Sequence, residues 1–192
     1  MSVQFTWRFR TSLGLMTSAE VEVHSGNLTV ELSCPSFYDN YPHLVLLLDG
    51  AEVFDAPVLE PRILLGGLLE SGSIFEESLA ILIAEEEEAW LIYSQGGAVR
   101  LHQADFELAA ELGGTQYLSR VRVGSDRLRS FEGQEISMDL VDWLRGVLEL
   151  GRQYVQLIQT GLPLLAPSDA AELAQFERIC LQGIDRIEHA LR

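Results

Sequence analysis

The sequence predicts an α+β fold, in which an N-terminal antiparallel β-sheet, built as a meander of hairpins, precedes a C-terminal antiparallel two-helix hairpin packed on it. Apolar residues alternate with polar ones early in the chain, and from Ser137 onward they recur at intervals of three and four. Strands in series followed by helices in series favour this class over an alternating βαβ fold. The 192 residues fit one domain, with residues 1–133 mainly in the sheet and 137–192 in the helical hairpin.

Alternation at period two is clearest near the N-terminus. Phe5, Trp7 and Phe9 fall on one side of an extended chain, and the residues between them fall on the other. Segments 20–24 and 28–33 alternate on either side of a Ser-Gly-Asn turn, which predicts a β-hairpin. Further strands are expected at 43–49, 63–69, 79–84, 90–94, 98–102, 117–123 and 127–131.

Three glycine pairs begin at Gly66, Gly96 and Gly113, and hairpin turns explain them because the residues that a phosphate loop needs do not follow. The run at 79–84 is apolar on both faces, which indicates a central strand covered on both sides. Segment 105–112 is ambiguous, since its alanines and glutamates favour a short helix while its neighbours favour a strand. We expect the helix there.

The helical hairpin is delimited by capping and stop signals. Ser137 or Asp139 can cap the first helix, which Gly161 and the following proline end. The second helix opens at Ser168 or Asp169, where a glutamate three residues later completes a capping box. Because the link between the helices is short, we expect them to lie antiparallel.

Cysteine usage and the N-terminus favour a cytoplasmic location. Cys34 and Cys180 lie far apart in sequence and favour two reduced thiols over one long-range disulfide. No basic region followed by an apolar region opens the chain. The longest apolar runs, 44–48 and 79–84, are too short to span a bilayer. All 13 basic residues are arginine, so the chain has no lysine for Schiff-base chemistry.

The usual catalytic and cofactor motifs are absent from the sequence, and we expect no catalytic residue, cofactor or metal site. None of the four histidines is paired with another at metal-ligand spacing. Cys34 with His43 is the one nearby combination that fits a nucleophile and its base. The acidic run 85–88 does not predict a cation site, because consecutive side chains diverge.

Charge is concentrated in one stretch. Residues 49–88 hold eleven acids against Arg62, a net charge of −10 within a total of −16. A field of this sign attracts basic partners and repels nucleic acid and anionic membranes, although a solvated, solubilising surface would have the same composition.

Two segments are candidate binding surfaces. Segment 33–43 has three aromatic residues between two prolines, as stiffened binding loops do. The same pattern is expected if these aromatic residues pack against a corner of the core. The expected partner-binding residues, from this segment and the acidic run, are Phe37, Tyr38, Asp39, Tyr41, His43, Glu85, Glu86, Glu87 and Glu88. Four arginines on a predicted hairpin are either neutralised by nearby acids or form an anion site: Arg120, Arg122, Arg127 and Arg129.

These features favour a non-enzymatic acidic domain that binds a basic protein partner, and a homodimer stays open. Its general character is that of immunity proteins and acidic secretion chaperones, although no motif of such a family is present. One alternative is a small enzyme or ligand-binding domain with a pocket between the sheet and the helices. Another is a structural or assembly protein with a self-complementary surface.

Overall fold

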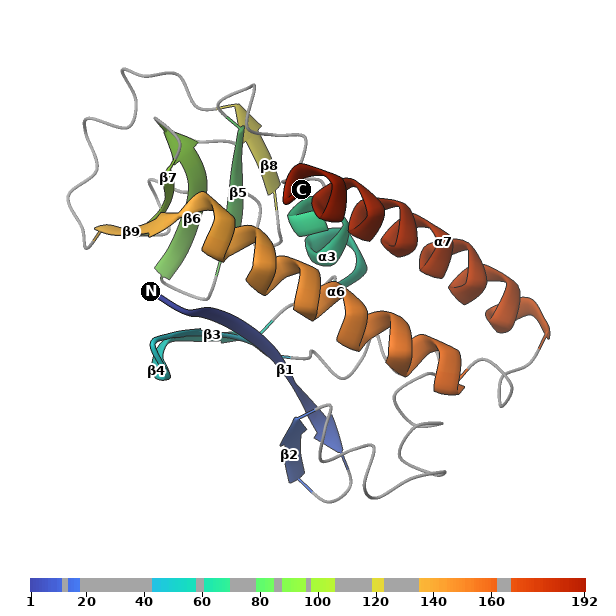
Figure 1. Ribbon diagram of the computed structural model, residues 1–192. Helices are drawn as coiled ribbons and strands as arrows, with labels where there is room; N and C mark the ends of the chain where they lie inside the picture. Colours follow the sequence, from blue (N-terminus) through green and yellow to red (C-terminus); the bar gives the residue numbers. More distant parts are fainter. Residues whose placement is uncertain are drawn as a thin grey trace.

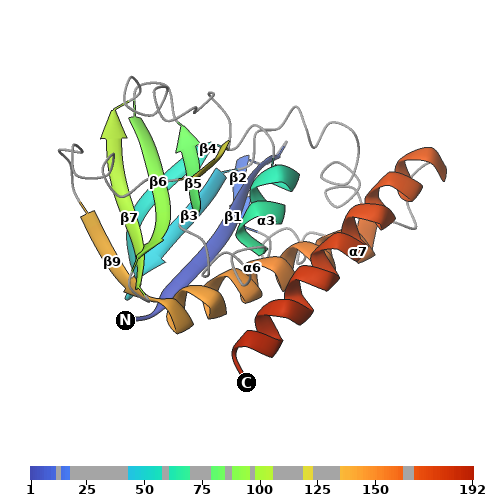
Figure 2. The same cartoon turned by 90° about the horizontal axis from the view of Figure 1, so that it is seen from above.

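The computed structural model describes residues 1–11, 14–17, 43–57, 61–69, 79–84, 88–95, 98–105, 119–122, 135–161 and 167–192. These residues have the predicted α+β arrangement, with antiparallel strands first and two long helices at the C-terminal end that pack on them (Figure 1). The described strands form two sheets, whereas the sequence analysis expected one. Figure 2 shows the same arrangement from above, with α7 crossing α6.

The first sheet has the strand order β2-β1-β3-β4 and is antiparallel throughout. Its strands are β1 (Val3–Thr11), β2 (Gly14–Thr17), β3 (His43–Leu48) and β4 (Ala51–Pro57). Strands β3 and β4 are joined by Asp49 and Gly50, both of which have positive φ, at 49° and 81°. Positive φ at both central residues is the geometry of a type I′ turn, which Asp-Gly favours.

The second sheet has the order β8-β5-β6-β7-β9. Its strands are β5 (Leu79–Ala84), β6 (Glu88–Gln95), β7 (Ala98–Asp105), β8 (Ser119–Arg122) and β9 (Glu135–Asp139). Gln95 pairs with Ala98, which confirms the hairpin predicted around the glycine pair at 96. Strand β5 has a neighbour on each side, as its apolar sequence predicted, and one of them is β8.

Residues 61–69 contradict the sequence analysis, which predicted a strand at 63–69 and a turn at Gly66. They form helix α3 (Pro61–Leu69). A proline suits the first turn of a helix, and Leu65, Leu68 and Leu69 are buried at the spacing of one helix face. The prediction was wrong because periodicity does not distinguish a short apolar strand from a short buried helix.

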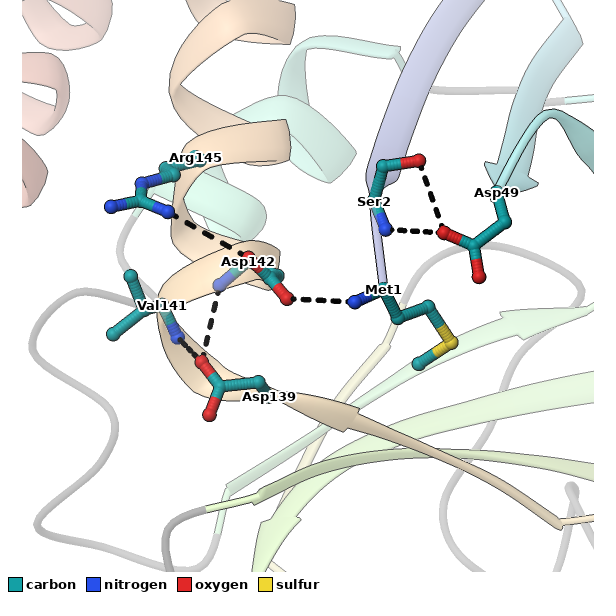
Figure 3. Close-up of polar contacts among 7 residues, drawn as sticks. All are labelled: Met1, Ser2, Asp49, Asp139, Val141, Asp142 and Arg145. Atoms are coloured by element: carbon teal, nitrogen blue, oxygen red, sulfur yellow. Dashed lines mark hydrogen bonds and ion pairs between the residues drawn. The ribbon is translucent and has the colours of Figure 1, made fainter.

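The two long helices are α6 (Leu140–Gly161) and α7 (Pro167–Ala190), and they confirm the predicted hairpin. Asp139 caps α6: its Oδ1 accepts hydrogen bonds from the backbone N–H groups of Val141 and Asp142, at 2.8 and 3.4 Å (Figure 3). The Asp142 carboxylate also lies 3.5 Å from the amino group of Met1. The first turn of α6 is therefore joined to the start of β1.

The core lies where β1 meets α6, and buried side chains of β3 and of the second sheet belong to the same cluster. Phe5 packs edge-on against Trp143 with ring centroids 5.0 Å apart. Trp7 contacts Tyr154 in the same way at 5.9 Å, and Tyr154 in turn contacts Phe176 of α7 at 5.8 Å. A series of aromatic rings thus connects the first sheet through α6 to α7.

Glycines allow the helices to approach their neighbours closely. A Cβ added at Gly146 would lie 2.9 Å from the carbonyl oxygen of Val3, on β1. Leu69, at the end of α3, occupies the space between α6 and α7, because a Cβ at Gly151 or Gly183 would lie 2.9 or 2.7 Å from its side chain. These distances are below those that real Cβ atoms show, so a side chain at either position would force movement.

Several expectations fall outside the described residues, including the hairpin at 20–33, the helix at 105–112 beyond Asp105, and the strand at 127–131. Among the residues that the structure describes, no helix combines the length and the apolar character needed to cross a lipid bilayer.

Replacing Gly183 by alanine tests the contact between α3 and α7. We expect Gly183→Ala to lower the free energy of unfolding by about 1–3 kcal/mol in urea denaturation, because the added methyl group meets Leu69 Cβ. Gly66→Ala is the matched control, since a Cβ at Gly66 meets nothing within 4 Å and alanine raises helix stability by up to about 1 kcal/mol. Equal effects of the two substitutions would contradict the tight contact.

Candidate functional site

A cluster of polar side chains lies on the face of the first sheet that points away from α6. Trp7 and Leu44 point to the core, so their neighbours Arg8 and His43 lie on the opposite face, where they stand across from each other in register. Asp55 and Glu52, from β4, complete the set. We refer to Arg8, His43, Glu52 and Asp55 as the outer-face cluster.

The bonds of the outer-face cluster converge on Asp55. Arg8 donates from Nη1 to Asp55 Oδ2 at 2.6 Å and from Nη2 to Glu52 Oε2 at 2.9 Å. His43 Nδ1 lies 2.6 Å from Asp55 Oδ1. Both oxygens of Asp55 are therefore bonded, one to a guanidinium and one to an imidazole, and the three strands β1, β3 and β4 are joined across their outer face.

The surroundings of the cluster are half-buried. The side chains of His43 and Asp55 are each 23% exposed, whereas that of Glu52 is 45% exposed. Val45 is opposite Asp55 in register and is fully buried although it belongs to the same outer face. Partial shielding strengthens the interactions among these charged groups compared with a fully solvated surface.

Charge within the cluster is largely balanced. The bond to Glu52, together with the negative charges of Asp55 and Glu52, raises the pKa of Arg8, and burial opposes this only in part. The guanidinium is therefore a permanent cation there. With neutral imidazole, one arginine faces two carboxylates, and the cluster carries a net charge of −1.

The structure brings one predicted site residue, His43, into contact with the acidic stretch 49–88, through Asp55. Glu88 opens β6 and is paired in register with Asp105, on the second sheet. Arg120 and Arg122 lie in β8, where they pair in register with Ile81 and Leu79 of β5. The remaining predicted residues lie outside the described part: Phe37, Tyr38, Asp39, Tyr41, Glu85, Glu86, Glu87, Arg127 and Arg129.

Sequence reasoning missed Arg8, Glu52 and Asp55 as site residues. Arg8 and Asp55 are 47 positions apart, so no spacing rule connects them. The alternation in β1 and the Asp-Gly turn after β3 were visible in the sequence, but the pairing of β1 with β3 was needed to place the side chains together.

The thiol of Cys180 and the metal-binding side chains were the other groups to consider among the described residues. Cys180 is fully buried, and burial raises the pKa of its thiol to about 12, helped by the charge of Glu177. A thiol in this setting is not a nucleophile at neutral pH. Within the part of the chain that the structure describes, no group of three or more His, Cys, Asp or Glu side chains is placed to hold a metal ion.

Comparisons with protein-family models, with curated proteins and with solved structures each found no match to this chain. The assignment of a function therefore depends on the geometry and charge described above.

A double-mutant cycle measures the coupling within the outer-face cluster. We expect Arg8→Gln and Asp55→Asn each to destabilise the fold, with a coupling energy of about 1–2 kcal/mol from urea denaturation, because the bond between them is charge-assisted and half-buried. The ion pair of Arg152 and Glu188, 2.8 Å apart and more exposed, is the matched control and should couple by less than about 1 kcal/mol. Equal coupling in both pairs would show that partial burial adds nothing.

The raised pKa of Cys180 predicts a loss of stability at alkaline pH. The unfolded chain ionises its thiol from about the ordinary value of 9.0, whereas the folded chain keeps the proton up to about 12. Because the unfolded state then binds fewer protons, the free energy of unfolding falls as pH rises through this window. We expect wild type to lose about 1 kcal/mol more than Cys180→Ala between pH 8 and pH 10. Identical losses would contradict the assignment.

Proposed function

We propose that this chain is an acidic protein-binding domain that engages a basic protein partner in the cytoplasm. The observation that carries the proposal is the charge distribution, in which residues 49–88 supply −10 of the total of −16. A concentrated field of one sign raises the association rate of oppositely charged partners and disfavours nucleic acid and anionic membrane surfaces. Such a role has the general character of an immunity protein or an acidic chaperone.

The described part of the acidic stretch bears on this proposal in two ways. Asp49 and Glu52 are exposed at the turn and the first residues of β4, so this portion of the stretch faces solvent. In addition, Glu52 and Asp55 already hold a guanidinium, that of Arg8, at 2.9 and 2.6 Å. Because Arg8 already pairs with these two carboxylates, the proposed attraction of a basic partner rests mainly on the other acids of the stretch.

In the proposal, the acidic run Glu85–Glu88 steers the partner, and the aromatic segment supplies contact area. Phe37, Tyr38 and Tyr41 are the proposed anchors, because rigid aromatic side chains dominate binding energy at protein interfaces. Asp39 and His43 flank them. The arginines at 120, 122, 127 and 129 stay a predicted anion site that this function does not require.

The first test is affinity capture from a lysate of the native host, at low salt and at 0.5 M salt, with identification by mass spectrometry. We expect one basic protein to be enriched at low salt and lost at high salt, since screening shortens the range of charge interactions. The absence of any basic protein at low salt would overturn the proposal.

Two charge-matched variants then locate the surface by titration calorimetry with the purified partner. Replacing Glu85 and Glu86 by arginine changes the net charge from −16 to −12, and so does replacing Glu149 and Asp185, which are exposed on α6 and α7. We expect the first pair to weaken binding about tenfold and the second to have little effect. Equal weakening would mean that overall charge, and not the acidic run, attracts the partner.

A further inference from the structure

The hydrogen bond between His43 and Asp55 determines which ring nitrogen of His43 carries the proton. Asp55 accepts from Arg8 through its other oxygen, so its carboxylate is an ionised acceptor. Nδ1 of His43, 2.6 Å from Asp55 Oδ1, must therefore be the donor. In the neutral imidazole, Nε2 then has no proton and presents a lone pair.

The imidazole is also held in place. His43 begins β3, Asp55 comes from β4, and Arg8 from β1 fixes Asp55 from the far side, so three paired strands set the geometry. The fully buried Val45 lies next to Asp55 on the same face, while His43 itself keeps 23% of its side-chain surface exposed. The imidazole is therefore partly open to solvent, and the carboxylate that orients it is partly shielded from water.

We propose that His43 is a proton-accepting site, whose Nε2 takes a proton from the hydroxyl group of a small uncharged ligand or from water attacking such a ligand. The two carboxylates of the cluster outnumber its arginine, and the whole chain carries −16, so anionic ligands are disfavoured. This site goes beyond the proposed function, which needs surface charge and aromatic contacts but no proton transfer.

The proton transfer balances without a further reactant. The O–H bond of the ligand or water breaks, an N–H bond forms at Nε2, and the electron pair stays on the oxygen, which becomes a nucleophile. The imidazolium that results keeps its Nδ1–H bond to Asp55, and Asp55 stays ionised. The proton on Nε2 then passes to the leaving group or returns to solvent.

The first measurement is the tautomer of His43 in the intact wild-type chain, from ¹⁵N chemical shifts of the imidazole nitrogens at pH 8. We expect the Nδ1–H tautomer, with the resonance of Nε2 at the position of an unprotonated nitrogen. A predominant Nε2–H tautomer would overturn the proposal, and this result needs no variant to fold.

The second measurement separates the acceptor atom from the bond that joins the strands. In His43→Asn, the amide nitrogen replaces Nδ1 as donor to Asp55, but nothing replaces Nε2. With p-nitrophenyl acetate as the uncharged probe, we expect hydrolysis by this variant to fall about tenfold or more, while its thermal unfolding stays close to that of wild type. His189→Asn, at an exposed position near the end of α7, is the matched control and should leave hydrolysis unchanged.

Unchanged hydrolysis in His43→Asn would mean that His43 only joins strands β3 and β4, and the proposed site would be abandoned. If His43→Asn fails to fold, Asp55→Asn decides the point. That variant frees the ring to change tautomer, so it should shift the ¹⁵N resonances of His43 and lower hydrolysis together; a shift without a loss of hydrolysis would also overturn the proposal.

Discussion

The close approach of α6 to its neighbours is the constraint on which the rest of the structure depends. Gly146 brings the helix against the backbone of β1, and Gly151 leaves room for Leu69 of α3. Because β9 ends at Asp139 and α6 begins at Leu140, the helix is also tied directly to the second sheet. A side chain in place of Gly146 would meet the carbonyl oxygen of Val3, and backbone cannot rotate away as a flexible side chain can. The register between helix and sheet therefore rests on these glycines.

The packing of β1 against α6 also explains why a polar cluster exists on the other face. Phe5 and Trp7 make aromatic contacts with α6. Because successive side chains of a strand point to opposite faces, Arg8 lies on the face away from α6. The pairing of β1 with β3 then sets His43 directly across from Arg8. Asp55, on the next strand, bonds to both Arg8 and His43 and so joins the two side chains. The site is thus a consequence of how the core is packed.

Those parts of the fold that depend on local signals could be predicted from the sequence. Helix α6 could be predicted because Asp139 and Gly161 delimit a sustained apolar stripe. The hairpin of β6 and β7 could be predicted because a glycine pair separates two apolar runs. Helix α3 could not be predicted, because nine residues make too few helical turns to distinguish a helical pattern of apolar residues from an extended one. Its pair of glycines was also typical of a turn. The outer-face cluster could not be predicted from the sequence for a different reason. Its members come from three strands, and only the pairing of those strands, a long-range property, places Arg8, His43 and Asp55 together.

The outer-face cluster also bears on how the acidic stretch should be understood. Glu52 and Asp55 contribute to the net charge of −10 counted over residues 49–88. In the folded chain both are paired with Arg8, so part of that negative charge is compensated within the molecule. A partner that approaches this end of the stretch meets a bound guanidinium as well as the carboxylates. The attraction proposed for a basic partner must then come mainly from acids elsewhere in the stretch, while the Asp55 end is specialised by its bond to His43. Steering by charge and proton acceptance by an oriented imidazole are different demands. Of the described carboxylates of β4, Asp55 is bonded to the imidazole of His43 and to Arg8, and Glu52 is bonded to Arg8.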